Sequence, residues 1–505
     1  MISPVRPTRV TAGAALPSDN RWWALAAVTL AQLMVLLDLT VMNLALPSMQ
    51  TALGLSDHDR QWVLTVYALT YGSLLLLGGR LSDLIGRRRA LLIGLIGFAV
   101  ASALGAFAID LTTLLLARGA QGVFGALLTP SVTALVAVMF PEPRERGRAF
   151  GIIGMIMGSG AGIGLILGGV LTDAFDWRSA FMFNLPVAVV AAVGILLTVR
   201  PVPGGERRRI DVPGVILATA GLGSLVFGAS RAELDGWMAT STIGLLLLGA
   251  ALITGFVAVQ RETIAPLLPL RVLRNRRRVA AMLAGPGNGL GTIPAFLSLA
   301  VYFQVVRGDS PLETGLALLP NAIVIVFVAR YVGRWIPRLP LVALLGPGLL
   351  AIAAALAILG RISADSSYLT GVVPVLVLLG VGTALVMPTA NSTATQDAGP
   401  DTGVAGALVM TSMQVGIAFG AAIFGSLAAS SAADYAARHA GAEGVVAQAT
   451  AHGIAAASTT AAVVLAVLAI VVILVSAQRR RVVEPSPSRH TPVAPTPSTT
   501  ARQAS

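Results

Sequence analysis

The sequence predicts an all-α polytopic membrane protein with fourteen transmembrane helices, and three observations lead to this prediction. Of the 505 residues, 55% are hydrophobic and 11% are charged, whereas roughly 25% of an average soluble domain is charged. Apolar segments of about 20 residues, the length that spans a bilayer, follow one another along the chain. All 35 basic residues other than histidine are arginines, and they gather in alternate loops, as in multi-pass proteins.

The spans are bounded by clusters of Arg, Asp, Pro and Gly, which punctuate regular structure. Their predicted ranges are 22–46, 61–79, 90–109, 111–138, 149–171, 180–199, 212–230, 240–259, 279–305, 314–332, 339–360, 368–390, 402–428 and 454–476. We expect the first segment, 1–21, and the tail, 477–505, to be cytoplasmic. The tail is rich in Pro, Ser and Thr and is expected to be disordered.

Arginine placement predicts the orientation of the chain. With both termini in the cytoplasm, 28 of the 35 arginines fall on the cytoplasmic side, 6 fall outside, and Arg118 lies within a span. Cytoplasmic loops collect arginine, and omitting one span would reverse every later loop. We read most of these clusters as determinants of topology and not as ligand sites.

The first span contains an acid at membrane depth. Asp38 lies roughly 13 Å inside the helix end at Pro47, at about 1.5 Å per residue, too deep for its side chain to reach water. A carboxylate there costs about 2.5 kcal/mol or more, so such residues usually face a cavity or a partner charge. Asp38 is therefore the leading functional candidate; the alternative is an acid that only fixes helix packing.

The residues around Asp38 carry a family resemblance. The segment LDLTVMNLALP, 37–47, resembles the first-helix signature of the fourteen-helix drug:proton antiporters of the major facilitator superfamily. The resemblance implies two six-helix bundles, 22–199 and 279–476, that rock around a central cavity. It also implies a linker, 200–278, with two extra helices outside the core, and proton-coupled export of small hydrophobic compounds, neutral or cationic.

The turn after the second span, GGRLSDLIGRRR, resembles the most recurrent motif of the superfamily. Glycines let helices approach closely, and an acid at such a turn can meet the positive N-terminus of another helix. The resemblance implies that the acid caps the helix beginning near Thr402 and braces the outward-open state; the alternative is an ordinary exposed turn. The matching residues are Gly79, Asp83, Gly86, Arg87 and Arg88.

The fourth span holds the second buried charge. Its segment LLLARGAQG resembles the family's fourth-helix motif, with Arg118, Gln121 and Gly122 matching. Arg118 lies about 10 Å below the outer helix end, close to the depth of Asp38, so we expect the two charges to pair. Arg118 favours the ionised acid, whereas a dry surround favours the protonated acid. We therefore predict that Asp38 binds a proton on the outer side and releases it inward while cargo moves out.

The fifth span carries glycines at the spacing of the superfamily's antiporter motif, which resembles a closely packed hinge and favours export over import. The sequence departs from the motif at Leu165, where the family has a proline, so a kink-forming residue is missing. Glycine-rich packing without directional meaning is the alternative. The five glycines are Gly151, Gly160, Gly164, Gly168 and Gly169.

The remaining candidates are uncharged. The six spans from 279 onward contain no Asp or Glu, which favours neutral or monocationic cargo, and the turn 328–338 lacks the acid that would repeat the brace. Each polar side chain that we assign to a possible cavity has a hydrogen bond between helices as its alternative role. These residues are Gln32, Asn43, Gln121, Asn288, Gln304, Asn321, Asn391, Thr411 and Gln414.

Several other classes of function are disfavoured. The chain has no cysteine, no nucleotide-binding loop, no nucleophile elbow and no metal-ligand spacing, so we expect no enzyme, no cofactor and no metal site. The expected partners are drug-like small molecules, protons and the lipid bilayer, not nucleic acid, and we expect a monomer in the cell membrane. A proton-coupled symporter and an exporter of an endogenous metabolite remain alternatives.

Overall fold

The structure, a computed structural model, describes residues 20–201, 211–442 and 444–477, and these ranges form helices and no strand. The predicted tail and most of the segment 1–21 therefore lie outside the described residues. The first group of helices is α1 (Arg21–Leu53), α2 (Asp57–Ile85), α3 (Arg87–Ala106), α4 (Leu111–Met139), α5 (Pro143–Ala174), the short α6 (Ser179–Met182) and α7 (Asn184–Thr198).

Two further helices, α8 (Val212–Asp235) and α9 (Thr240–Glu262), separate this group from a second one. A 3₁₀ segment, η1 (Leu270–Arg274), precedes the second group, and another, η4 (Gly399–Asp401), lies within it. The second group is α10 (Arg276–Val301) with its π-helical end η2 (Tyr302–Val306), α11 (Pro311–Trp335), α12 (Val342–Leu359), η3 (Tyr368–Val372) leading into α13 (Val373–Thr395), α14 (Thr402–Arg438) and α15 (Val445–Ser476).

The helices confirm the predicted all-α polytopic fold. Thirteen described helical segments are long and apolar enough to cross a membrane, and the remaining predicted span, 149–171, lies within the 32-residue helix α5. Several helices are longer than predicted: α1 continues past Pro47 to Leu53, and α14 continues to Arg438. Hydropathy sets only the length of the apolar stretch, while backbone hydrogen bonding can continue into more polar sequence; in α14 the added residues 429–438 are rich in alanine, the best helix former.

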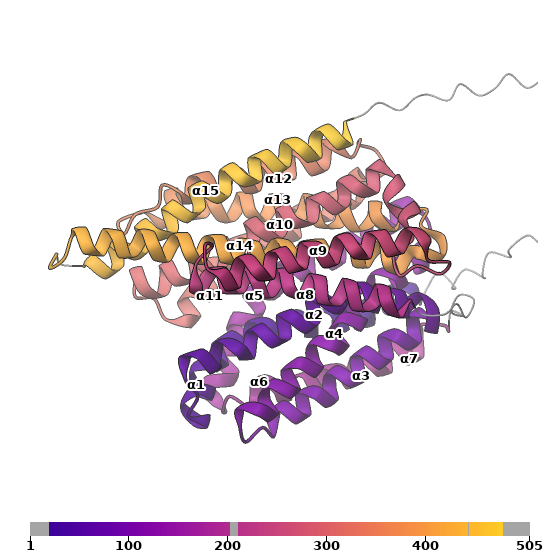
Figure 1. Ribbon diagram of the computed structural model, residues 1–505, viewed down its shortest axis with the longest axis horizontal. Coiled ribbons are helices and arrows are strands. Elements are labelled where there is room, and N and C mark those ends of the chain that lie inside the picture. The colour runs from indigo at the N-terminus through magenta and orange to yellow at the C-terminus, as the bar shows by residue number, and fades with distance from the viewer. Residues whose placement is uncertain (1–19, 202–210, 443, 478–505) are drawn as a thin grey trace, which may run out of the picture.

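The two groups lie side by side. Figure 1 shows α1 to α7 in indigo and purple on one side, α10 to α15 in colours from rose through orange to yellow on the other, and α8 and α9 along the border between them. One apolar cluster lies wholly within the second group, and another is centred on the first and reaches α13 and α14. α8 packs against α2 and α14, so the two extra helices cover the junction of the groups.

The groups meet closely near one end, which carries the helix ends and connecting residues of the segments 139–148, 260–278 and 333–341 and is called here the arginine-rich face. Gly147 of α5 packs against the backbone of Gly333 of α11, where an added Cβ would lie 3.1 Å from the Gly333 Cα. One turn further, a Cβ on Gly151 would lie 3.0 Å from the carbonyl oxygen of Ala329. The molecule is therefore closed at the arginine-rich face.

Candidate functional site

Asp38 and Arg118 form an ion pair in the interior of the first group. Nη1 of Arg118 donates to Oδ2 of Asp38 at 2.7 Å, and both side chains are 0% exposed. The same Nη1 donates to Oε1 of Gln121, one turn further along α4, at 2.7 Å. Breaking a pair at this depth would leave an uncompensated buried charge, so the two residues depend on each other.

Two neutral side chains that the sequence analysis did not select complete this network. Asn184, at the start of α7, donates to Oδ1 of Asp38 at 2.8 Å, and Gln121 donates to the same oxygen at 2.9 Å. Ser102 of α3 accepts from both amides, at 3.2 Å from Asn184 and 2.8 Å from Gln121. In the sequence, Asn184 could have been noticed as the only amide in the apolar run AFMFNLPVAVV. Its contact with Asp38, however, depends on the direction of its side chain, which the sequence does not show.

A central cavity of about 310 Å³ lies between the two groups. Its wall is mainly apolar, and none of the described residues that line it is charged. Methionines of the second group and aromatic rings from both groups share the wall with amides and hydroxyls, a composition typical of small-molecule sites. Of the predicted cavity residues, the lining includes Gln32, Asn288, Asn321, Asn391 and Gln414.

Other predicted positions lie elsewhere. Gln121 faces the ion pair, because position i+3 from Arg118 shares its helix face. Gln304 lies exposed in η2, beyond the stretch of α10 that borders the cavity, and Thr411 is buried outside the lining. The side chain of Asn43 is outside the described residues. Asp38 and Arg118 are also absent from the cavity wall.

One tyrosine stands between the ion pair and the cavity. Tyr67 of α2 lines the cavity, and its ring centroid lies 4.4 Å from Cζ of Arg118. One turn earlier, the carbonyl oxygen of Val63 accepts from Nε of Arg118 at 3.3 Å. A guanidinium over an aromatic face is attracted by the ring quadrupole, so α2 holds Arg118 from the cavity side.

Asp83 lies in the last turn of α2, because this helix continues to Ile85, beyond the predicted span 61–79. The Asp83 side chain contacts the start of α14. Its carboxylate accepts from the backbone N–H of Gly403 at 3.0 Å and of Val404 at 3.2 Å. These donors are free at a helix N-terminus, where the dipole also favours an anion. Arg87 donates to Asp83 at 3.3 Å. Asp83 therefore links the first group to the second at the arginine-rich face.

The remaining motif residues around Asp83 have separate structural roles. A Cβ on Gly79 would lie 2.7 Å from the carbonyl oxygen of Gly403, so only glycine permits this approach of α2 to α14. Gly86 has φ +96°, a left-handed conformation that glycine adopts without strain, and it alone separates α2 from α3. Arg88 donates to the carbonyl oxygen of Leu196 in α7 at 2.9 Å.

The glycines of α5 serve two neighbours. Gly160, Gly164 and Gly168 face α1, where a Cβ on Gly164 would lie 2.6 Å from the Cβ of Thr40. Gly151 faces α11 instead, so it belongs to the contact between the groups. The contacts of Gly169, the fifth predicted glycine, are outside the described part of the structure. α5 is helical throughout, including position 165, where the motif proline is missing.

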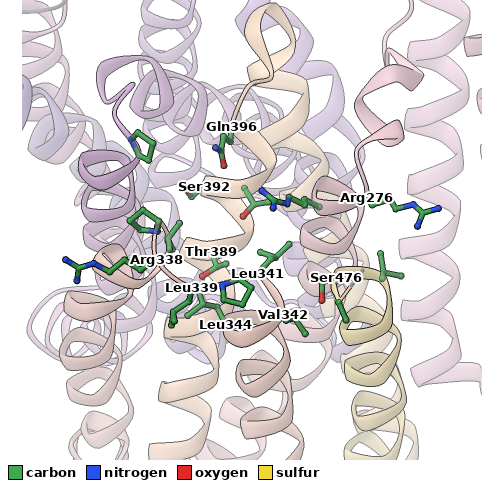
Figure 2. Close-up of a pocket in the computed structure, with 18 of the residues that line it drawn as sticks. Arg276, Arg338, Leu339, Leu341, Val342, Leu344, Thr389, Ser392, Gln396 and Ser476 are labelled. Carbon is green, nitrogen blue, oxygen red and sulfur yellow. The ribbon is translucent and has the colours of Figure 1, made fainter. Parts of the chain in front are cut away.

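A second pocket, of about 590 Å³, opens at the arginine-rich face. In Figure 2, Arg276 and Arg338 extend to opposite sides of it, while Thr389 and Ser392 of α13 lie between them. Met387 and Asn391, on another face of α13, line the central cavity. α13 thus separates the second pocket from the ion-pair side of the molecule, and we assign the central cavity as the candidate cargo site.

The described residues contain no group of three His, Cys, Asp or Glu that could hold a metal.

Comparison with known proteins supplies the family. The family model described as Major Facilitator Superfamily matches residues 28–421. The puromycin resistance protein pur8 of Streptomyces alboniger is 41% identical over 441 residues, covering 86% of this chain and 88% of that protein. The cephamycin export protein CmcT of Amycolatopsis lactamdurans is 34% identical over 414 residues, covering 79% and 83%. The lincomycin resistance protein of Streptomyces lincolnensis is 32% identical over 416 residues, covering 81% and 85%.

Solved structures share the fold. The crystal structure of the human organic anion transporter MFSD10 aligns with a TM-score of 0.62 at 19% identity, covering 91% of this chain and 99% of that one. A peptide transporter of the POT family, in an autoinhibited state, aligns with a TM-score of 0.59 at 15% identity, covering 92% and 99%. At these identities the likeness concerns the arrangement of helices.

Proposed function

The chain belongs to the Major Facilitator Superfamily, and from this premise we propose that it exports small drug-like compounds across the cytoplasmic membrane in exchange for protons. It is a transporter and not an enzyme. The names of three relatives, which refer to resistance to puromycin and lincomycin and to export of cephamycin, support export of such compounds. We infer the coupling of export to protons from one observation, the fully buried Asp38–Arg118 pair.

The buried pair supports proton coupling because an acid at this depth can be ionised or protonated, and the two forms leave the network with different net charges. Ionised, Asp38 is compensated by Arg118 and by two amide donors. Protonated, it leaves the network with one net positive charge in a low-dielectric interior. Exchange between these conditions changes the local charge balance, which is what a proton-driven conformational equilibrium requires.

The cavity supports the choice of cargo. Its charge-free wall of apolar, aromatic and amide groups suits hydrophobic compounds with a few hydrogen-bonding groups. Helices of both groups line it within a single chain, so we propose the monomer as the transport unit. We also propose that both termini are cytoplasmic, which makes the arginine-rich face the cytoplasmic face and the structure an outward-facing state.

Transport into everted membrane vesicles tests this proposal. Respiration acidifies the vesicle interior, so an exporter that exchanges protons for cargo accumulates puromycin inside, whereas a symporter expels it. We expect Asp38→Asn to abolish accumulation while the protein remains folded in the membrane. The matched control is Asp365→Asn, which makes the same chemical change in an exposed loop. Full accumulation by the Asp38→Asn protein would remove proton exchange at Asp38 from the mechanism.

The alternative of an endogenous cargo has the same cavity and the same coupling. Export of a cellular metabolite would leave drug susceptibility unchanged in cells that lack the protein, while the metabolite would rise inside them. Susceptibility profiling across puromycin, lincomycin and ethidium, together with intracellular metabolite levels, separates the two. Increased sensitivity to the drugs on deletion is the expected result.

A further inference from the structure

We propose that Tyr67 makes cargo and proton mutually exclusive, by controlling whether water in the central cavity reaches Asp38. This inference rests on the proposed antiport and names the residue through which the two sites communicate. The key observation is that one side chain belongs to both places: Tyr67 lines the cavity and lies against Arg118. Tyr67 is a positioning residue in this account, since it acts on Asp38 through Arg118.

The ring of Tyr67 closes the ion pair off from the cavity. Asp38, Arg118 and Gln121 are each 0% exposed, and Tyr67 itself is only 1% exposed. A proton can reach the carboxylate from the cavity only if water does, and the ring occupies the space beside the guanidinium. Desolvation of this kind strengthens the attraction between Asp38 and Arg118.

The backbone behind the ring is packed closely against α4. At Gly122, one turn beyond Arg118 in α4, an added Cβ would lie 2.8 Å from the carbonyl oxygen of Tyr67. This glycine of the fourth-helix motif therefore lets α2 press against α4 at the level of the ion pair. With the backbone held, the side-chain torsions of Tyr67 are the remaining means of opening the pair to the cavity.

The polar atoms at this junction are incompletely bonded. The hydroxyl of Tyr67 and Nη2 of Arg118 are both buried without a hydrogen-bond partner among the described residues. Unsatisfied buried groups are costly, so this arrangement favours entry of a partner, either water or a polar group of cargo. By contrast, Tyr71, one turn along α2, also lines the cavity but donates to Thr129 at 3.1 Å.

The charged and titratable neighbours of Asp38 are few. Arg118 contacts it from α4, and Tyr67 covers Arg118 from α2. The contacts from α3 and α7 come through the neutral Ser102 and Asn184. Asp38 is therefore the proton-binding group in this proposal, and Tyr67 sets the access of water to it on the cavity side.

These facts give a mechanism for exclusion. Cargo in the cavity packs against the ring and holds it on Arg118, which keeps the proton off Asp38. When cargo leaves, the ring is free to turn into the vacated space, water reaches the carboxylate, and the proton binds. Each ligand then opposes the other, and the opposition is reciprocal because it is one coupling free energy.

Proton release on cargo binding tests the role of Tyr67. Purified full-length protein in weakly buffered detergent is titrated with puromycin, lincomycin and ethidium while binding and pH are recorded. For the wild-type protein we expect about one proton per bound probe, and binding that weakens up to about tenfold per unit fall in pH, the linkage limit for one exchanged proton. For Tyr67→Ala we expect binding with no proton release and a dissociation constant independent of pH.

Controls separate this role from a purely structural one. Tyr67→Phe keeps the ring over Arg118, so each bound probe should still release about one proton, whatever the loss of the hydroxyl does to affinity. Tyr71→Ala removes the same volume from the same helix and from the cavity wall, so it should weaken cargo binding, but each probe that binds should still release about one proton. Tyr67→Leu replaces Tyr67→Ala if the alanine variant does not fold; failure of both to fold, with Tyr71→Ala folded, would assign Tyr67 to stability alone and overturn the inference.

The results distinguish the two proposals. Wild-type protein that binds none of the three probes, or binds one without releasing protons, rejects the proposed drug–proton exchange, and the role of Tyr67 falls with it. Wild-type release of protons that persists unchanged in Tyr67→Ala rejects the role of Tyr67 alone. Loss of release in Tyr67→Ala, with release retained in Tyr67→Phe and Tyr71→Ala, supports it.

Discussion

Removal of the Asp83 carboxylate should open the arginine-rich face. In the structure this carboxylate accepts from the N–H groups of Gly403 and Val404 at 3.0 and 3.2 Å, and it is 8% exposed. Hydrogen bonds to a charged group contribute roughly 1.5–3 kcal/mol each. Water satisfies the same groups when the face is open, so we assign the brace about 2 kcal/mol in total. Asp83→Ala should therefore lower the ratio of closed to open protein about 30-fold.

The absence of cysteine from the chain makes this shift measurable by site-directed spin labelling. Cysteines introduced at the exposed positions Arg144 and Arg334 flank the contact between Gly147 and Gly333. Double electron–electron resonance between the two labels should report one short distance when the face is closed. In the Asp83→Ala background we expect a second, longer distance to become the major population.

Two further variants control for general damage. Asp83→Asn removes the charge but keeps an acceptor, so it should give an intermediate population. Asp211→Ala removes an acid that is also 8% exposed and that caps its own helix through the N–H of Gly214 at 2.9 Å; it should leave the label distance unchanged. A distance distribution that is the same in Asp83→Ala and in the unmodified background would refute the bracing role.

Three more outcomes follow from the structure. Arg118→Ala should destabilise the protein by about 3–5 kcal/mol because Asp38 would be left as an uncompensated buried charge; thermal unfolding checks this, and stability equal to that of the wild type would contradict it. Gly164→Val should weaken folding by about 1–3 kcal/mol through overpacking of α5 on α1, whereas Gly244→Val, where nothing lies within 4 Å, should be neutral in the same assay. Capping of the first turn of α4 by the Asp110 side chain lowers the pKa of that carboxyl below its usual 3.8. The ionised cap should therefore stabilise this turn above pH 3.8 and lose its effect as the pH falls through the lowered pKa. Hydrogen exchange measures this: the protection of the amides in this turn should fall at low pH in the wild-type protein and should not change with pH in Asp110→Asn.

The two charged residues of the candidate site could be predicted from the sequence because a charged residue at membrane depth is rare. Asp38 and Arg118 stood out against apolar spans, and helix geometry placed them at one level. The neutral members of the network did not stand out. Ser102 and Asn184 belong to residue types that occur in many membrane helices as packing or hydrogen-bonding groups, so only their direction distinguishes them.

The cavity shows the same limit. Amides in the second group were sound candidates as a class, yet Gln304 is exposed at a helix end while Asn288 lies on the cavity wall. Periodicity within one helix fixes relative directions, but the rotation of that helix against its neighbours comes from packing.

By itself, the sequence determined the number and order of the membrane spans, the alternation of arginine between loops and the depth of two opposite charges, because each of these depends on hydropathy and on distance along one chain. Tertiary structure alone decided that a tyrosine covers the ion pair, that Asp83 meets Gly403 across the junction of the groups, and that α8 and α9 border that junction. These are contacts between helices distant in sequence, and their geometry depends on how small residues such as Gly79 and Gly122 let the helices approach.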